Sequence, residues 1–216
     1  QEGKKCLLKP ANRAELFSTL LSCIGECGSG FTTATVAGVT VEYCLHNTGG
    51  WATGSGSSCL DEPLNVSLVT NMAHLFHNAR QFNQDISGWD VSSVTTMKHM
   101  FSYAYAFNQD LSTWDVSKVT DMRYMFDWAY IFNGDIRTWN VGEVTNMNGM
   151  FHQTWPFNHD ISGWNVKKVT NTNSMFNGAS GFNQDLSAWD VSQVTNMDYM
   201  FYMNTKIDVP LCGSAW

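Results

Sequence analysis

The sequence predicts an α/β repeat solenoid, a right-handed coil in which each 25-residue turn contributes a short strand and a short helix. The first observation is a phrase that recurs with a constant period of 25 residues and without insertion. Its five copies begin at Phe82, Phe107, Phe132, Phe157 and Phe182. The second observation is that the two halves of each copy have different hydrophobic periods. Such a fixed period is typical of stacked repeats that bury their apolar faces against their neighbours.

The repeat divides the chain into three parts. Residues 57–206 are expected to form a six-repeat solenoid, in which the first copy is divergent but keeps the phrase VSLVTNMAHLF. Residues 1–56 are expected to form a disulfide-tied N-terminal cap that shields one open end of the solenoid. Residues 207–216 are interpreted as a short C-terminal stop.

Within the cap, the sequence predicts one helix and a strand region. The segment Asn12-Arg13-Ala14-Glu15 has the pattern of a capping box, and apolar residues follow on one helical face as far as Gly25. Residues 31–45 are rich in Thr and Val, and apolar residues alternate between positions 39 and 45. This alternation is typical of a strand.

Each repeat is expected to contain one strand and about two turns of helix. Residues 86–91 alternate apolar and polar side chains, with a break at Gly88 and Trp89, and their branched and aromatic content favours a strand. From Met97 onward, apolar residues recur at i, i+3 and i+4, which predicts a helical face. Thr95 is the expected N-cap of this helix.

Composition and charge limit the partners and the location. The chain has 216 residues, of which 44% are hydrophobic and 14% are charged, and its net charge is −7. Because no run of Lys or Arg is present, nucleic acid and anionic membrane surfaces are not expected partners. No stretch approaches the roughly 18 apolar residues of a membrane span, so no membrane insertion is expected. Since the sequence begins with Gln1, we expect a mature, secreted protein that is extracellular or at a cell surface.

The cysteines point to the same location, because an even number of cysteines in an extracellular protein implies disulfides. They are Cys6, Cys23, Cys27, Cys44, Cys59 and Cys212. Five stacked repeats separate Cys59 from Cys212, too far for a disulfide along one solenoid. Either the N-terminal segment runs back to Cys212, or Cys212 bonds to another copy of the chain. The sequon at Asn65 predicts N-glycosylation.

The phrase FNQDISGWDVSSVTTMKHMF and its later copies resemble the BspA-like leucine-rich repeat family of surface proteins, which is also met in mycoplasma lipoproteins and in some protists. The resemblance covers residues 57–206 and does not extend to residues 1–56. It implies a leucine-rich-repeat-like extracellular coil used for adhesion and protein binding. It supplies no catalytic residues to carry over.

Stacked copies place equivalent residues in columns. The columns of Phe82, Trp89 and Phe101 lie on apolar faces and are expected to pack in the core. The column of Met97 is expected there too, with Thr172 as a looser or polar spot. A column of aspartates is expected to close Asx turns, and calcium bound between its members is the alternative. This column consists of Asp85, Asp110, Asp135, Asp160 and Asp185.

Three histidines have a metal-like arrangement. His74 and His77 are three residues apart, and His99 follows His74 by one repeat, so their imidazoles can meet. Because no carboxylate is in register to orient them, we interpret them as surface histidines rather than as a zinc or copper site, and we expect no metal and no cofactor. Without a Ser-His-Asp order, an HExxH motif or a glycine-rich phosphate loop, no enzyme activity is expected.

Partner contacts are expected in columns that vary between copies yet carry large side chains. Three such columns pass through His99, Tyr103 and Tyr105. An exposed aromatic cluster there suits a protein or glycan partner, although some rings could instead cover the helix ends. The expected binding residues are Tyr103, Tyr105, Tyr124, Trp128, Tyr130, Trp155 and Tyr199.

Two functions are consistent with these patterns. The first is a non-catalytic extracellular repeat protein that mediates adhesion, or binds protein or glycan, through an aromatic side face. The second is a structural subunit whose copies assemble head to tail into an extracellular filament, with Cys212 as a link between copies.

Overall fold

A computed structural model describes residues 31–36, 39–44 and 66–208 of the chain. The first two segments are the strands β1 (Phe31–Val36) and β2 (Val39–Cys44), which pair antiparallel as a two-stranded sheet. Their register runs from Phe31 opposite Cys44 to Val36 opposite Val39. Strand structure predicted within residues 31–45 is therefore confirmed. The helix predicted after Asn12 lies outside the described residues.

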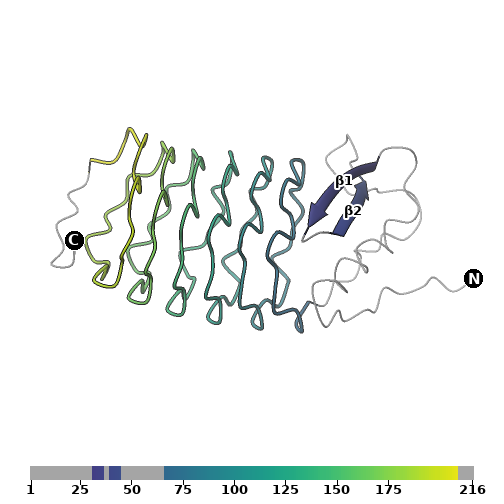
Figure 1. Ribbon diagram of the computed structural model, residues 1–216, viewed down its shortest axis with the longest axis horizontal. Helices are drawn as coiled ribbons and strands as arrows, with labels where there is room; N and C mark the ends of the chain where they lie inside the picture. The colour runs from purple at the N-terminus through teal and green to yellow at the C-terminus, as the bar shows by residue number, and fades with distance from the viewer. Residues whose placement is uncertain (1–30, 37–38, 45–65, 209–216) are drawn as a thin grey trace, which may run out of the picture.

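Residues 66–208 wind as successive coils that stack side by side along one direction (Figure 1). Backbone hydrogen bonds join neighbouring coils: the N–H of Thr95 donates to the carbonyl of Thr70, and the N–H of Met97 donates to the carbonyl of Asp121. Isolated parallel bridges link the coils at one position in each, namely Asn71, Thr96, Asp121, Asn146, Asn171 and Asn196. Each coil thus finds partners for its backbone polar groups on its neighbours, at the sequence period of 25 residues.

The predicted α/β solenoid, with a strand and a helix in every turn, is wrong. Residues 66–208 contain no helix, and the only strand-like pairings among them are the isolated bridges. In the described part of the chain, no helix is long and apolar enough to cross a membrane.

The segment that begins at Met97 forms consecutive turns where a helix was predicted. The N–H of Met100 donates to the carbonyl of Met97, three residues back. His99 and Tyr103 have φ angles of 54° and 60°, which a right-handed helix cannot contain. The N–H groups of His99 and Phe101 donate to the next coil instead of to the preceding helical turn. These turns bury Met97, Met100 and Phe101 as a helix would, and the apolar spacing is therefore the same.

Two further details of the predicted secondary structure are wrong for the same reason. Thr95 is not a helix N-cap: its hydroxyl donates to the carbonyl of Thr70 in the preceding coil, at 3.1 Å. In residues 86–91, the N–H of Trp89 donates to the carbonyl of Ile86 and closes a turn where a strand was expected. Ile86 and Val91 of this segment are nevertheless buried in the core.

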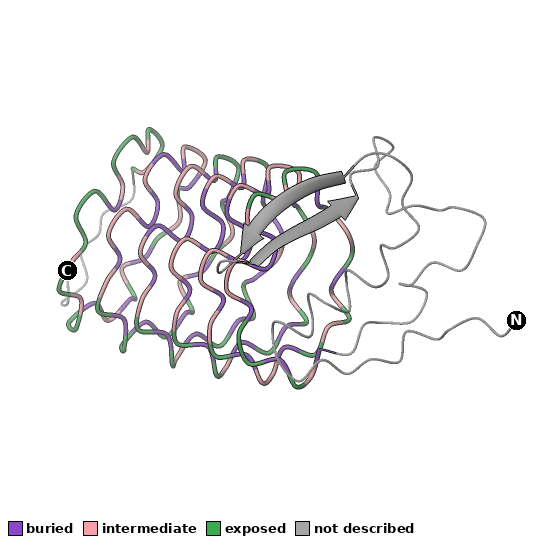
Figure 2. Cartoon of the chain, turned by 45° about the vertical axis from the view of Figure 1, so that its right-hand side comes forward, coloured by how far each residue is buried: buried purple, intermediate pink, exposed green. Residues whose placement is uncertain are grey.

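Columns of aromatic and aliphatic side chains fill the interior, and buried positions recur from coil to coil (Figure 2). The rings of Phe101 and Phe126 stack with centroids 5.5 Å apart, and those of Trp114 and Trp139 stack at 6.5 Å. The core role predicted for the Phe and Trp columns is confirmed, with Trp89 only partly buried. The polar spot predicted in the Met column is also present.

That polar spot is Thr172, which is 1% exposed and replaces Met in its column. Among the described residues, its hydroxyl has no hydrogen-bond partner. The next member of the same column, Met197 in the last described coil, is 36% exposed, because no further described coil covers it.

The aspartate column closes turns as predicted. Oδ1 of Asp85 accepts a hydrogen bond from the N–H of Ser87 at 2.9 Å, and this bond together with the Ser87 hydroxyl lowers the pKa of the carboxyl. Equivalent bonds recur at Asp110, Asp135, Asp160 and Asp185. The neighbouring asparagine column instead joins coils, since Oδ1 of Asn83 accepts from the N–H of Asn108 at 2.8 Å.

Candidate functional site

Two positions in each coil have a left-handed backbone, and they are two of the three variable columns that the sequence analysis selected. The first is occupied by His74, His99, Tyr124, Gly149, Ser174 and Tyr199, with φ between 53° and 61°. The second is occupied by Asn78, Tyr103, Trp128, Gln153, Gly178 and Met203, with φ between 57° and 69°. All of these residues except the two glycines are half-buried or exposed. The turns therefore present the most variable side chains at the surface.

Gly149 ends the first column of rings. Its φ is 59°, and a Cβ at this position would collide with the ring of Tyr124 in the preceding coil. The ring of Tyr124 in turn stacks on that of His99, with centroids 4.9 Å apart. From His74 to Gly149, each ring of this column thus lies against the left-handed residue of the next coil.

Five rings form one continuous surface over three coils, which we name the aromatic patch: Tyr103, Tyr105, Trp128, Tyr130 and Trp155. The ring of Tyr130 lies between those of Tyr105 and Trp155, at centroid distances of 4.8 Å and 4.7 Å. Tyr103 stacks on Trp128 at 6.0 Å, and Trp128 meets Tyr130 edge to face at 5.2 Å. Trp155 is 49% exposed and the other four are half-buried.

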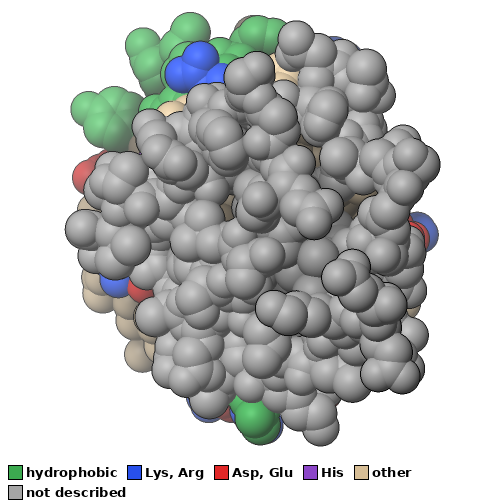
Figure 3. Space-filling view, turned by 90° about the vertical axis from the view of Figure 1, so that its right-hand side faces the viewer, with side chains coloured by type: hydrophobic (Ala, Val, Ile, Leu, Met, Phe, Trp, Pro, Cys, Tyr) green, Lys and Arg blue, Asp and Glu red, His purple; other side chains and the backbone are tan. Residues whose placement is uncertain are grey.

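The surroundings of the patch raise the pKa of two of its phenols. Burial, together with the charge of Asp127, raises the pKa of Tyr103, and burial also raises the pKa of Tyr130. The guanidinium of Arg80 lies over the ring of Tyr105, 5.3 Å from its centroid, in a cation–π contact. In the end-on view, hydrophobic side chains protrude at one margin of the molecule beside a basic side chain (Figure 3).

A buried polar network supports the patch from below. Oδ1 of Asp127 lies 2.7 Å from Nδ1 of His152, and its Oδ2 accepts from the hydroxyl of Ser102 at 3.2 Å. Asp127 is 6% exposed and Ser102 is fully buried. Because the serine bonds to the carboxylate rather than to the imidazole, this trio lacks the serine–base contact of a nucleophilic triad. Its geometry is that of a structural network.

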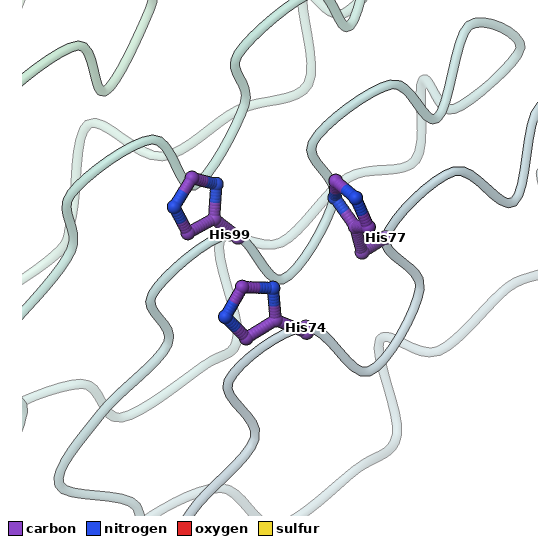
Figure 4. Close-up of side chains that lie close together, drawn as sticks. All are labelled: His74, His77 and His99. Carbon is purple, nitrogen blue, oxygen red and sulfur yellow. The ribbon is translucent and has the colours of Figure 1, made fainter. Parts of the chain in front are cut away.

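The three histidines come together next to the patch. The rings of His74 and His99 stack at 4.7 Å, and His77 meets both edge to face, at 5.5 Å and 6.0 Å (Figure 4). His77 also contacts Tyr103 edge to face at 5.8 Å, which joins the two clusters. Burial, followed by the charges of neighbouring histidines and of Lys98, lowers the pKa of His99 to about 4. Burial also lowers the pKa of His77, against a smaller opposing effect of Asp127.

Comparison with known proteins gives a family. The family described as "Mycoplasma protein of unknown function, DUF285" matches residues 58–154 and again residues 111–216. Together the two matches span the whole repeated region and most of the chain. The chain belongs to this family. Neither a search of curated proteins nor a search of solved structures found a match.

The remaining predicted residues of this family member are placed as follows. Tyr124 joins the histidine column through its contact with His99, not the aromatic patch. Tyr199 lies in the last coil, is 66% exposed and meets Tyr202 edge to face at 5.8 Å. Asn65 and five of the predicted disulfide cysteines lie outside the described residues, and of Cys44 only its place in β2 is described.

The sequence analysis missed the polar column under the patch. The column consists of His77, Ser102, Asp127, His152, Asn177 and Tyr202, and it directly precedes the Tyr103 column. The sequence did carry a signal for this column. Its residues vary between copies and are mostly polar, although the column directly follows that of Phe101, which is fully buried. Ile131, 49% exposed and next in sequence to Tyr130, was also missed as an exposed apolar side chain.

Proposed function

We propose that this chain is a non-catalytic, extracellular repeat protein that binds a partner protein through the aromatic patch. The observation that carries the proposal is the continuity of five partly exposed rings across three coils. Tyr and Trp are the residues most enriched where binding energy is concentrated in protein interfaces. An apolar surface of this kind, held on a stacked backbone, marks an interaction site.

A protein partner fits the ring geometry better than a glycan. Sugars stack on open aromatic faces, but the ring of Tyr130 is flanked by those of Tyr105 and Trp155, with centroids at 4.8 Å and 4.7 Å. Among the five rings, Trp155 is the most exposed, at 49%, and the other four are half-buried. Tyrosine and tryptophan rings that combine apolar faces with polar groups suit a mixed apolar and hydrogen-bonding protein surface.

The resemblance of the repeats to BspA-like surface proteins supports the adhesion function. Six cysteines and the sequon at Asn65 support an extracellular location. The absence of a serine–base contact in the Ser102 network supports a non-catalytic function.

The test is a binding screen with matched variants of the full chain. Immobilised wild-type protein, the double variant Tyr130→Ala/Trp155→Ala and the control Tyr202→Ala are probed with purified extracellular proteins and with a glycan array. Tyr202 is an exposed aromatic residue outside the patch, at 58% exposure. We expect at least one protein that binds wild type and the control but loses about tenfold or more in affinity for the double variant. If only glycans bind through the patch, the proposal of a protein partner is rejected. If the double variant binds partners as tightly as wild type, the patch is rejected as the binding site.

Head-to-tail self-assembly is a second candidate, and the last described coil is the observation that favours it. Tyr199, Tyr202 and Met203 are 66%, 58% and 62% exposed there. In earlier coils the N–H groups of His99 and Tyr103 donate to the next coil, whereas those of Tyr199 and Met203 donate to no described residue. Such an edge is a template for a further coil.

Light scattering of the native protein, with and without reductant, tests this candidate. Assembly through the last coil predicts concentration-dependent oligomers that are lost in Tyr199→Lys/Met203→Lys. A series of oligomer bands on non-reducing gels that disappears with reductant would show that disulfides link the copies. A strictly monomeric protein at all concentrations would reject self-assembly.

A further inference from the structure

The first two described coils bring three imidazoles to one place. His74, His77 and His99 each offer a ring nitrogen, and these nitrogens all lie within 4.8 Å of one another. His74 and His99 occupy the same left-handed position on adjacent coils, and His77 follows His74 by one turn. Figure 4 shows the three rings around a shared space.

Two of these imidazoles carry a buried nitrogen with an unmet bonding need. Nδ1 of His77 and Nδ1 of His99 are buried, and neither has a hydrogen-bond partner among the described residues. A buried polar atom without a partner costs free energy, and native proteins supply nearly every such atom with a protein group, a water or an ion. The rings are half-buried, which differs from ordinary surface histidines.

Equivalent positions in later coils are satisfied in another way. In the column of His77, the next three residues are Ser102, Asp127 and His152, which bond to one another. In the column of His99, the next ring is Tyr124, followed by Gly149. Only the first two coils of the described stack combine three histidines, so the cluster is not a consequence of the repeat.

We propose that His74, His77 and His99 form a three-histidine site for a late first-row divalent metal ion, with Zn²⁺ as the ion we commit to. The group contains no carboxylate, so it does not suit calcium or magnesium, which prefer oxygen ligands. Imidazole nitrogen is a preferred ligand of Zn²⁺, and three histidines leave a fourth coordination position for water. This site is separate from the proposed protein-binding function, although His77 contacts Tyr103 of the patch.

Zinc binding requires the histidine rings to move. Zinc bonds to histidine nitrogen at about 2.0–2.1 Å in a tetrahedral arrangement, which places the ligand nitrogens about 3.3 Å apart. The rings of His74 and His99 are close to parallel, with 16° between their planes, so their lone pairs do not meet at one point. At least one ring must turn, and turning His99 also changes its stacking on Tyr124. If His99 is the ring that turns, metal binding should alter the NMR signals of Tyr124 together with those of the histidines.

Zinc titration of the full chain tests the proposal, with free thiols first alkylated so that cysteine does not bind the probe. Calorimetry is expected to give one Zn²⁺ per chain, and histidine ring NMR is expected to shift His74, His77 and His99 together. Each of His74→Gln, His77→Gln and His99→Gln should weaken zinc binding by about tenfold or more. The control is His159→Gln. It removes a ring outside the cluster, whose Nε2 hydrogen-bonds the carbonyl of Asn133, and it should leave the zinc affinity unchanged.

Two results would overturn the proposal. One is unaltered ring signals of the three histidines in wild type at millimolar Zn²⁺, a readout that does not depend on any variant folding. The other is zinc affinity in the three variants equal to that of wild type, with their melting curves in the absence of metal showing that they fold.

Discussion

Asp127 in one coil and His152 in the next are joined by a contact of 2.7 Å between Oδ1 and Nδ1, beneath the rings of the aromatic patch. The edge-to-face contact of His152 with Trp128, at 6.1 Å, connects this pair to the patch. Because Ser102 donates to the other oxygen of Asp127, this carboxylate links its own coil to the coils before and after it. The patch is therefore supported by a fixed polar network rather than by loose side chains.

Replacing Asp127 with Ala should destabilise the protein. The change leaves the buried hydroxyl of Ser102 and Nδ1 of His152 without their partner, and it should lower the free energy of unfolding by about 1–3 kcal/mol. Urea denaturation measures this. The control is Asp115→Ala, which removes an exposed carboxylate that accepts from the N–H of Ser117, and it should cost less than about 1 kcal/mol. Equal losses in the two variants would contradict the network.

The sequence predicted the period, the core columns and the aspartate turns, because each depends on residues that every copy repeats. It did not predict the backbone between them. Apolar residues at Met97, Met100 and Phe101 fit a helix and fit two turns equally well, since both bury the same side chains. The distinguishing signal was Gly149 and Gly178 in the columns of His99 and Tyr103, where a left-handed backbone favours glycine.

The candidate sites, too, could be predicted from the sequence only in part. Five of the seven predicted aromatic residues form the patch, because stacked copies with the same period bring their columns together. Proximity of His74, His77 and His99 followed from the same register. Their half-burial did not, because it depends on the left-handed turns that the sequence pattern concealed.

Replacing Ser174 with Gly should stabilise the protein. Ser174 has a φ of 53°, and a side chain in this backbone region costs about 1 kcal/mol, which glycine avoids. Thermal and urea unfolding should show a gain of that order. The matched control is Ala188→Gly, in a column that already contains Gly88 and Gly163 and has no positive φ, where glycine should cost up to about 1 kcal/mol. A loss of stability at both positions would contradict the turn assignment.

Replacing Thr172 with Val should also stabilise the protein. The hydroxyl of Thr172 is buried and unpartnered among the described residues, so its removal should raise the free energy of unfolding by about 1 kcal/mol. Thr154→Val is the opposite case, because that buried hydroxyl donates to the carbonyl of Phe126 at 2.7 Å. Its removal should cost about 1 kcal/mol or more. Denaturant unfolding of both variants checks the sign, and a loss at Thr172 would indicate a partner for its hydroxyl.

Acid sensitivity should depend on Arg137. The guanidinium and backbone N–H of Arg137 hold the pKa of Asp135 at about 2, below its ordinary value of 3.8. A lowered folded pKa means that the unfolded chain binds the proton first as the pH falls. The stabilisation by this carboxylate is therefore complete above pH 3.8 and is lost between pH 3.8 and about 2.

Arg137→Ser introduces the residue that the other four coils carry at this position. Serine keeps the backbone bond, and at Asp85, Asp160 and Asp185 it still lowers the carboxyl pKa. We therefore expect the pKa of Asp135 to rise from about 2 yet stay below 3.8, so that the loss of its stabilisation is complete at a higher pH. Carboxyl ¹³C NMR titration of Asp135 measures the shift. Lys206→Ser, which removes a positive charge in the last coil, should leave the Asp135 titration unchanged, and an equal shift in both variants would show that net charge, not the Arg137 contact, sets this pKa.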